Sequence, residues 1–166
     1  MASSIRLPVV SGQFYPSDKD ELYELIHRCF THALGPGKFP SANSISNRQE
    51  ISRVECLVVP HAGYIYSGPV AAHSYRIAFN FFQKFKDEKD VTIIILGPNH
   101  YGIGSGIALS GASRWRTPLG DLKVASELGK ILTSSSNIID VDEVAHSREH
   151  SIEVQIPFLQ AMGSSL

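Results

Sequence analysis

Two continuous apolar runs constrain the fold of this 166-residue chain more than any other feature. Residues 54–60 (VECLVVP) and 91–97 (VTIIILG) lack the alternation of apolar and polar residues that a strand with one solvent-exposed face shows. They are typical of strands in a parallel sheet that is covered on both faces. Residues 69–85 between them have the length and pattern of a crossover helix, with Pro69 in its first turn. The three segments predict a right-handed β-α-β unit.

The remaining segments predict further helices and short strands around that unit. Ser17 is a good N-cap for residues 18–34, whose apolar side chains recur at helical spacing. Pro157 is expected to kink the last predicted helix or to mark its late start. Short strands are predicted at residues 106–110 and 137–142, and helices at residues 121–135 and 147–162.

We therefore predict a single α/β domain over residues 1–166, built on a mostly parallel sheet with helices on both faces. The length of the chain suits one domain with a core of its own. The polar stretch over about residues 35–50 has no period, so it is predicted to be a flexible surface connection inside that domain.

Charge and composition exclude several classes of partner. The formal net charge is −1, so nothing suggests electrostatic binding to nucleic acid or to an anionic membrane. The apolar runs are far shorter than the roughly 20 residues of a membrane-spanning helix, and the N-terminus does not read as a signal peptide. We expect a cytoplasmic protein without nucleic-acid or membrane partners. Cys29 and Cys56 have no CxxC spacing and are predicted to be packing residues.

Two histidines follow the predicted strands at matching positions. His61 comes directly after Pro60, and His100 follows Gly97 and Pro98. Parallel strands joined by a crossover end at the same edge of the sheet, so the two imidazoles are expected to emerge together. Neutral imidazole suits iron, zinc and copper, and the pair therefore predicts two metal ligands. The alternative is that each histidine only hydrogen-bonds a loop carbonyl.

A third histidine, His150, lies at or near the start of the last predicted helix. A helix N-terminus disfavours protonated imidazole, so His150 is expected to be neutral and to serve as an acid, a base or a hydrogen-bond donor. His146 is interpreted as a loop residue, because its spacing to His150 does not make an HExxH zinc motif. His27, His32 and His73 lie in predicted helices without clustered partners.

Residues 113–121 (SRWRTPLGD) carry the only tryptophan, Trp115, at a predicted ordered turn. Arg114 or Arg116 could pair with a substrate carboxylate or phosphate, or could form a surface salt bridge, and the sequence leaves both open. The glycine-rich residues 102–106 have neither the dinucleotide-binding nor the phosphate-loop spacing, so they are predicted to form a flexible turn.

Five segments, SGQFYP, PHAGYIYSGPVAAHSY, ILGPNH, RTPLGDL and EHSIEVQIPFL, occur in this order along nearly the whole chain. Together they resemble the Memo family, named for a mediator of cell motility. The resemblance implies a three-layer α/β fold similar to the class III, LigB-type extradiol dioxygenases, which use non-haem iron(II) held by histidines and a carboxylate. It implies that His61 and His100 bind the metal, iron(II) or copper, and that His150 is a further site residue.

The resemblance also implies that such proteins continue well past the EHSIE segment. Their remaining metal ligand lies there, a cysteine in the animal members, and neither Cys29 nor Cys56 falls at that place. The chain is therefore expected to correspond to the N-terminal half to two-thirds of a Memo-like domain.

Two functions are compatible with these residues. The first is a metal-binding protein with a dioxygenase-like site and metal-dependent redox activity. The second is a non-catalytic scaffold whose cleft binds a peptide, a phosphopeptide or a small anion. Whether the chain is an enzyme, and which ligand it takes, stay open between them. The residues predicted to line such a cleft are Tyr64, Tyr66, His100, Trp115 and Arg116.

Overall fold

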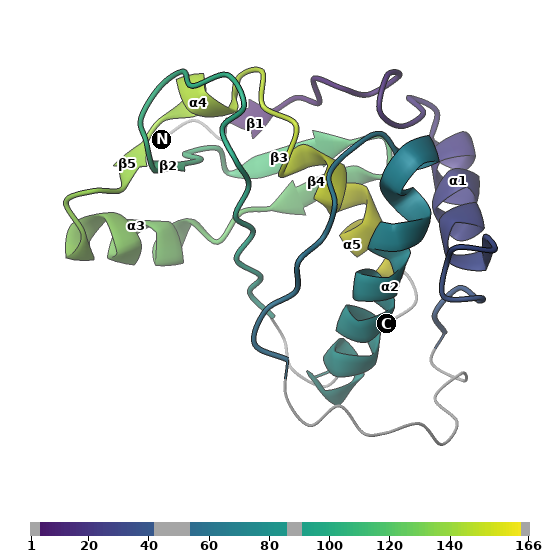
Figure 1. Ribbon diagram of the computed structural model, residues 1–166. Helices are drawn as coiled ribbons and strands as arrows, with labels where there is room; N and C mark the ends of the chain where they lie inside the picture. The colour runs from purple at the N-terminus through teal and green to yellow at the C-terminus, as the bar shows by residue number, and fades with distance from the viewer. Residues whose placement is uncertain (1–3, 42–53, 86–90, 164–166) are drawn as a thin grey trace.

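The computed structural model describes residues 4–41, 54–85 and 91–163, and most of the predicted flexible connection at residues 35–50 lies outside them (Figure 1). The helices are α1 (Lys19–Thr31), α2 (Tyr64–Phe82), α3 (Ser126–Ser135), α4 (Glu143–His146) and α5 (Ile156–Gly163), with 3-10 turns η2 (Gln83–Phe85) and η3 (Glu153–Gln155). The strands are β1 (Ile5–Arg6), β2 (Ala108–Leu109), β3 (Arg114–Thr117), β4 (Gly120–Lys123) and β5 (Asp140–Val141).

Helix α1 is the predicted amphipathic helix, and its cap is Asp18 instead of Ser17. The Asp18 carboxylate accepts hydrogen bonds from the backbone N–H groups of Asp20 and Glu21, at 2.9 and 3.0 Å. These are donors that the first turn of a helix leaves without backbone partners. The apolar face of the helix is buried through Leu22, Ile26, Cys29 and Phe30.

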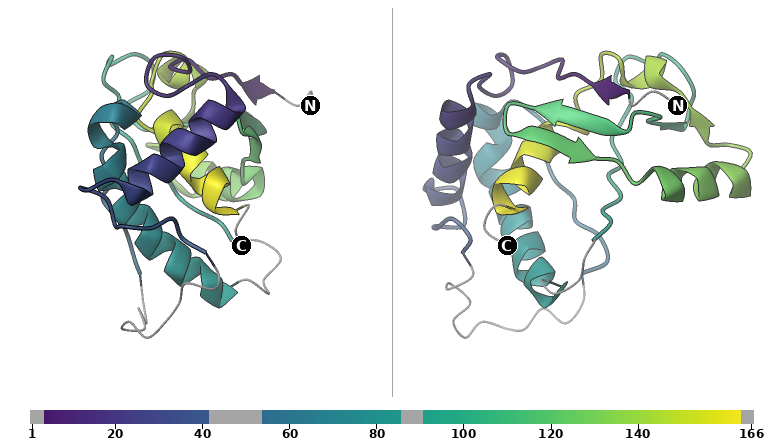
Figure 2. Two further views of the ribbon diagram at one scale, coloured as in Figure 1. Left: turned by 90° about the vertical axis from the view of Figure 1, so that its right-hand side faces the viewer. Right: turned by 180° about the vertical axis from the view of Figure 1, so that it is seen from behind.

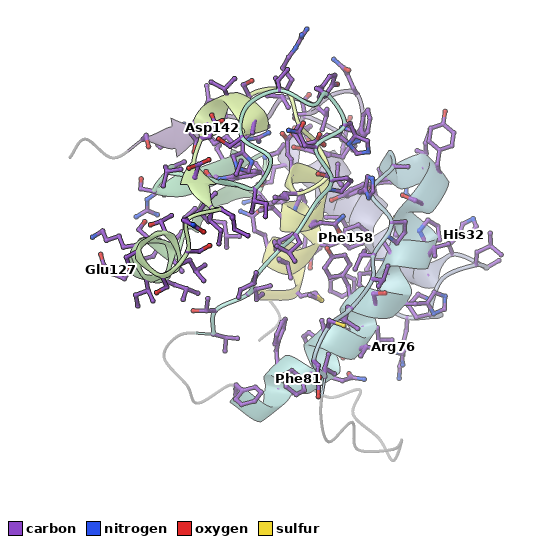
Figure 3. The ribbon with its side chains drawn as sticks, turned by 60° about the vertical axis from the view of Figure 1, so that its left-hand side comes forward. His32, Arg76, Phe81, Glu127, Asp142 and Phe158 are labelled. Atoms are coloured by element: carbon purple, nitrogen blue, oxygen red, sulfur yellow. The ribbon has the colours of Figure 1, made fainter. Side chains whose placement is uncertain are left out.

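The main core lies where helices α1, α2 and α5 pack together (Figure 2). Phe158 of α5 is at its centre and points between the helices (Figure 3). Its ring stacks on Tyr75 with centroids 4.6 Å apart and meets Phe30 edge-on at 6.1 Å. Aromatic contacts of this kind add to the free energy that burial of the rings contributes.

The strands form two small sheets, one of mixed direction and one parallel. In the first, β1 pairs parallel with β3, and β3 pairs antiparallel with β4 through a turn that ends at Gly120, whose φ is 122°. In the second, β2 pairs parallel with β5, which confirms the two short strands predicted from sequence. The α/β class is therefore correct, while the sheets are smaller and less uniformly parallel than expected.

The two apolar runs do not form strands, and this corrects the predicted β-α-β unit. Neither residues 54–60 nor residues 91–97 carry a strand assignment. Val58 and Leu96 are 92% and 91% exposed, and Cys56 is exposed instead of packed. A strand needs a neighbouring strand for its backbone N–H and C=O groups, and among the described residues no strand is paired with either run. The sequence pattern was that of covered strands, but in this structure most residues of the two runs are exposed, and Val59 is a half-buried exception that packs against the main core.

The helices near these runs also begin elsewhere than predicted. Helix α2 starts at Tyr64, so Pro69 lies inside it instead of in its first turn. The last predicted helix starts late, at Ile156, with Pro157 in its first turn. This confirms the second of the two expectations for Pro157, a late start of the helix. In the described ranges no helix combines the length and apolar character that crossing a membrane requires.

The exposure of the two runs leads to a prediction about stability. Val58→Ala and Leu96→Ala are each expected to change the free energy of unfolding by less than about 0.5 kcal/mol, because neither side chain is removed from water. Leu22→Ala, at a fully buried position, is the matched control and is expected to cost about 2–5 kcal/mol. Urea unfolding followed by circular dichroism measures all three. Losses above about 1.5 kcal/mol at either exposed position would show that the runs are covered in solution.

Candidate metal centre

His61 and His100 meet in the structure as the sequence predicted. Their Nε2 atoms are 3.2 Å apart, and their ring centroids are separated by 5.1 Å. His61 lies just before Gly63, the N-cap of α2, and His100 lies in the loop that follows the second apolar run. Residues that are distant along the chain therefore present the same ring atom to one point.

His150 completes a cluster of three imidazoles. Its ring stacks on that of His100 at 4.7 Å and lies 6.0 Å from that of His61. The pKa of His150 is lowered, first by burial and then by the neighbouring His100 and His61. The charge of Glu149 acts in the opposite direction but does not outweigh them. Burial therefore favours the neutral form of His150. The expected cause, a helix N-terminus at this residue, is wrong, because helix α5 begins only at Ile156.

Glu149 is the residue that the sequence did not single out. Its side chain is 6% exposed, and its Oε1 accepts from Nδ1 of His100 at 2.9 Å and from the backbone N–H groups of His150 and Ser151 at 2.8 and 2.9 Å. Oε2 accepts from the backbone N–H of His100 at 2.7 Å. Burial raises the pKa of the carboxyl, but these hydrogen bonds outweigh it and lower that pKa to about 2.

The contact with Glu149 fixes the tautomer of His100. An ionised carboxylate only accepts, so the Nδ1 of His100 carries the proton and donates it. The lone pair then lies on Nε2, the atom that faces His61. The one signal in the sequence was the position of Glu149 directly before His150, which places an acid beside the cluster.

The segment from Glu149 to Gln155 holds both histidine loops in place. Ser151 Oγ donates to the Pro98 carbonyl at 3.0 Å, and Gln155 Nε2 donates to the Pro60 carbonyl at 3.4 Å. A Cβ on Gly97 would collide with Ser151 Oγ, so the glycine allows the loop to approach this closely. The glycine at position 97 is therefore explained by a contact that is distant in sequence.

A buried ion pair anchors the other side of this segment. Arg6 donates to Glu153 at 2.8 Å and to the backbone carbonyls of Glu149 and His146, and its guanidinium lies 4.0 Å from the centre of the Trp115 ring. Arg6 thus ties strand β1 to the backbone that carries Glu149.

Of the residues predicted to line a peptide cleft, His100 belongs to the cluster, while Tyr64, Trp115 and Arg116 make their contacts elsewhere. Tyr64 is buried and donates its hydroxyl to the Val154 carbonyl, while Tyr66 is exposed on α2. Trp115 is buried, with its Nε1 donating to Ser110 Oγ. Arg116 forms an exposed salt bridge with Asp121 at 2.7 Å, which is one of the two alternatives left open for it.

The other histidines lie apart from the cluster. His146 ends helix α4 and is buried, so it is not the loop residue that was expected. Its ring packs edge-on against Trp115, and burial lowers its pKa. His27 stacks on Phe39, and His73 lies next to the Leu34 carbonyl at 3.0 Å.

The cluster has the donor chemistry of a metal centre. Within the described residues, ligand atoms of His100, Glu149 and His150 all lie within 4.8 Å of one another. Because the Glu149 carboxylate already accepts four hydrogen bonds, we assign it to orienting His100 and leave the metal to the imidazoles. Two histidines on one ion, each with a metal–nitrogen bond of about 2.05 Å, have their nitrogens about 2.9 Å apart when the N–metal–N angle is a right angle and about 3.4 Å apart when it is tetrahedral. The observed Nε2 separation of 3.2 Å lies between these two values.

Fold and site together define a mixed α/β protein with a three-histidine candidate metal centre. The chain belongs to the Memo family: the family model described as Memo-like protein matches residues 6–165. This confirms the resemblance seen in the five sequence segments.

Similar proteins from three organisms support the same assignment. MEMO1 family proteins of Nitrosopumilus maritimus and Desulfurococcus amylolyticus are 46% and 47% identical to the chain, over 96% and 93% of its length. A MEMO1 family protein of Methanopyrus kandleri is 45% identical over 93% of the chain. The chain spans about half the length of these curated relatives, 53%, 51% and 51% respectively.

Proposed function

We propose that the chain binds one non-haem metal ion, iron(II) or copper, through Nε2 of His61 and Nε2 of His100. The 3.2 Å separation of these two atoms carries the proposal, together with the fixed tautomer of His100. Without a metal, two neutral imidazoles at this distance can share one hydrogen bond. A metal ion replaces the shared proton and uses both lone pairs.

His150 is proposed as the acid or base beside the ion. Its ring is neutral, partly buried at 15% side-chain exposure, and stacked on His100, so it can take or give a proton at the edge of the centre. When bound, a redox-active ion with open coordination positions supplies electron transfer to a substrate or to oxygen. We further propose that the metal gives the protein redox activity. The proposed architecture is the three-layer one of the extradiol dioxygenases, and the proposed location is the cytoplasm.

An anaerobic iron(II) titration of the purified chain tests the proposal. We expect one ion per chain, with changes in the imidazole NMR signals of His61, His100 and His150 and none in those of His27 and His73. Binding also stabilises the folded state, by about 2.7 kcal/mol when free metal is 100 times its dissociation constant. Absence of saturable binding to a chain that circular dichroism shows to be folded would contradict the proposal.

Glu149→Gln is predicted to weaken metal binding by about 10- to 100-fold while both proposed ligands remain, which is the range seen when the partner of a histidine ligand is removed. Both oxygens of the Glu149 carboxylate accept hydrogen bonds, whereas glutamine has one oxygen and one NH2 group. The NH2 group must therefore face an N–H donor of His100 or of the backbone at His150 and Ser151, and that hydrogen bond is lost. The measurement is the iron(II) affinity, with imidazole ¹⁵N shifts as a direct reading of the His100 tautomer.

The matched control for Glu149 is Glu143→Gln. Glu143 also accepts from the backbone, at Gly111 and Ala112, and from the Ser110 hydroxyl, but it makes no contact with the three rings. Its replacement is expected to lower stability and leave metal affinity unchanged. An equal loss of affinity in both variants would mean that Glu149 acts only through the stability of the fold.

A further inference from the structure

The side chain of Gln155 joins the loop of His61 to the loop of His100. Its Nε2 donates to the Pro60 carbonyl at 3.4 Å and to the Ser151 carbonyl at 3.3 Å. Pro60 directly precedes His61 in the sequence. The hydroxyl of Ser151 donates in turn to the loop that carries His100. One amide group therefore lies between the two backbones that present the converging imidazoles.

Tyr75 fixes the direction of this amide. Both side chains are buried, and the Tyr75 hydroxyl donates to Oε1 of Gln155 at 2.5 Å. Burial raises the pKa of Tyr75, so the hydroxyl keeps its proton and acts as the donor. An amide that accepts on its oxygen presents its two N–H donors on the other side. There they meet the carbonyls of Pro60 and Ser151.

His61 is positioned through its backbone, whereas His100 is also oriented through its ring. The Glu149 carboxylate accepts from the ring of His100. In the part of the chain that the structure describes, the ring of His61 forms its hydrogen bond to His100 itself. The place of the His61 ring therefore depends on what holds the chain on either side of it.

Side chains hold the carbonyl of every second residue around His61, which is the repeat of an extended chain. Val58 accepts from Ser74 at 3.1 Å, Pro60 accepts from Gln155, and Ala62 accepts from Ser67 at 3.2 Å. Gln155 is buried, while the two serines are half-buried. Because a hydrogen bond is stronger away from water, Gln155 is the donor with the firmest hold on this segment.

We propose that Gln155 is the positioning residue of the metal centre, and that its amide, directed by Tyr75, sets the 3.2 Å separation of the two Nε2 atoms. The inference rests on the proposed function, because the two atoms are the ligands named there. Ligands that are already held at the right spacing lose little freedom when they bind. The affinity for the ion then depends on a residue that does not touch it.

Gln155→Met tests the inference, because methionine is unbranched and of similar length but has no N–H donor. The first measurement is the cross-relaxation between carbon-bound ring protons of His61 and His100 in the metal-free chain. The ring centroids lie 5.1 Å apart, and we expect this signal to lose most of its intensity in the variant. Iron(II) affinity is expected to fall about tenfold, the lower end of the range for outer partners of histidine ligands.

Gln160→Met is the matched control, because Gln160 makes the same arrangement at the turn between β3 and β4. Its Oε1 accepts from the Thr117 hydroxyl at 2.5 Å, and its Nε2 donates to the Gly120 carbonyl at 3.0 Å. This variant is expected to keep the ring signal and the iron(II) affinity of the original chain. An equal loss in both variants would overturn the inference, because Gln155 would then act only through the stability of the fold.

A second variant, Tyr75→Phe with Gln155→Met, keeps the test available if circular dichroism shows Gln155→Met to be unfolded. It removes the hydroxyl and the amide together, so the buried tyrosine is not left without its acceptor and the cost in stability is smaller. The same loss of ring signal and of affinity is expected.

The two measurements separate this inference from the metal proposal. A ring signal lost in Gln155→Met and kept in Gln160→Met, in a chain that takes no iron(II), would support the positioning role and contradict the metal centre. Unchanged iron(II) affinity in folded Gln155→Met would overturn the positioning role and leave the metal centre standing.

Discussion

Replacing Glu153 with alanine is expected to lower the free energy of unfolding by about 3–5 kcal/mol, a large part of the stability of a domain of this size. The side chain is fully buried and makes the ion pair with Arg6 at 2.8 Å. It also accepts from the backbone N–H groups of Val9 and Val10 and from the Tyr15 hydroxyl at 2.7 Å. Alanine would leave the buried Arg6 charge without its counter-charge and three neutral donors without their acceptor.

The Tyr15 hydroxyl shows how strongly this environment is organised around the carboxylate. Burial and the charge of Glu153 raise the pKa of Tyr15, so the hydroxyl remains protonated and donates. A donor that cannot reach water and has lost its acceptor costs roughly 1–3 kcal/mol. The expected loss therefore comes mostly from the groups left behind.

Urea unfolding of Glu153→Ala, followed by the fluorescence of Trp115, measures this loss. Trp115 is a local reporter because Arg6 lies over its ring. Glu127→Ala is the control: that carboxylate is 84% exposed on α3, where Figure 3 shows it at the outer surface, and its ion pair with Lys130 is expected to contribute less than about 0.5 kcal/mol. A loss below about 1 kcal/mol for Glu153→Ala would mean that water reaches Arg6 and Tyr15.

The meeting of His61 and His100 was predictable, although the reason given for it was only partly right. The prediction placed both at the ends of paired parallel strands, and these strands are absent from the structure. The two loops instead converge because the segment that carries Ser151 and Gln155 holds the Pro98 and Pro60 carbonyls. Contacts between residues so distant in sequence leave no periodic pattern, and a single sequence does not reveal them.

Glu149 and Tyr64 illustrate two further limits of the sequence. A glutamate within a polar segment such as SREHS has the composition of a solvated loop, and only its four N–H donors show that it is buried and structural. Tyr64 follows His61 closely and was placed in the cleft, yet its direction on α2 buries it under Val154. Helix α1, by contrast, was predictable because its burial follows the local period of 3.6 residues.

Replacing both His61 and His100 with alanine is expected to abolish measurable iron(II) binding, with a loss of at least about 100-fold, because the proposed centre takes its two defined ligands from them. The loss of stability should be small by comparison. The His100 side chain is 38% exposed, and its main structural contact is the one with Glu149. The iron(II) titration and urea unfolding are therefore measured on the same variant.

The matched control replaces His27 and His73, two exposed histidines on α1 and α2 outside the cluster. It removes the same number of imidazoles and is expected to keep full metal affinity. Retained binding in the His61, His100 variant would move the centre to other ligands and contradict the proposal. Lost binding in both variants would indicate surface binding by scattered histidines. If only the His61, His100 variant loses iron(II) binding, the ion is bound by the two converging Nε2 atoms and not by imidazole in general.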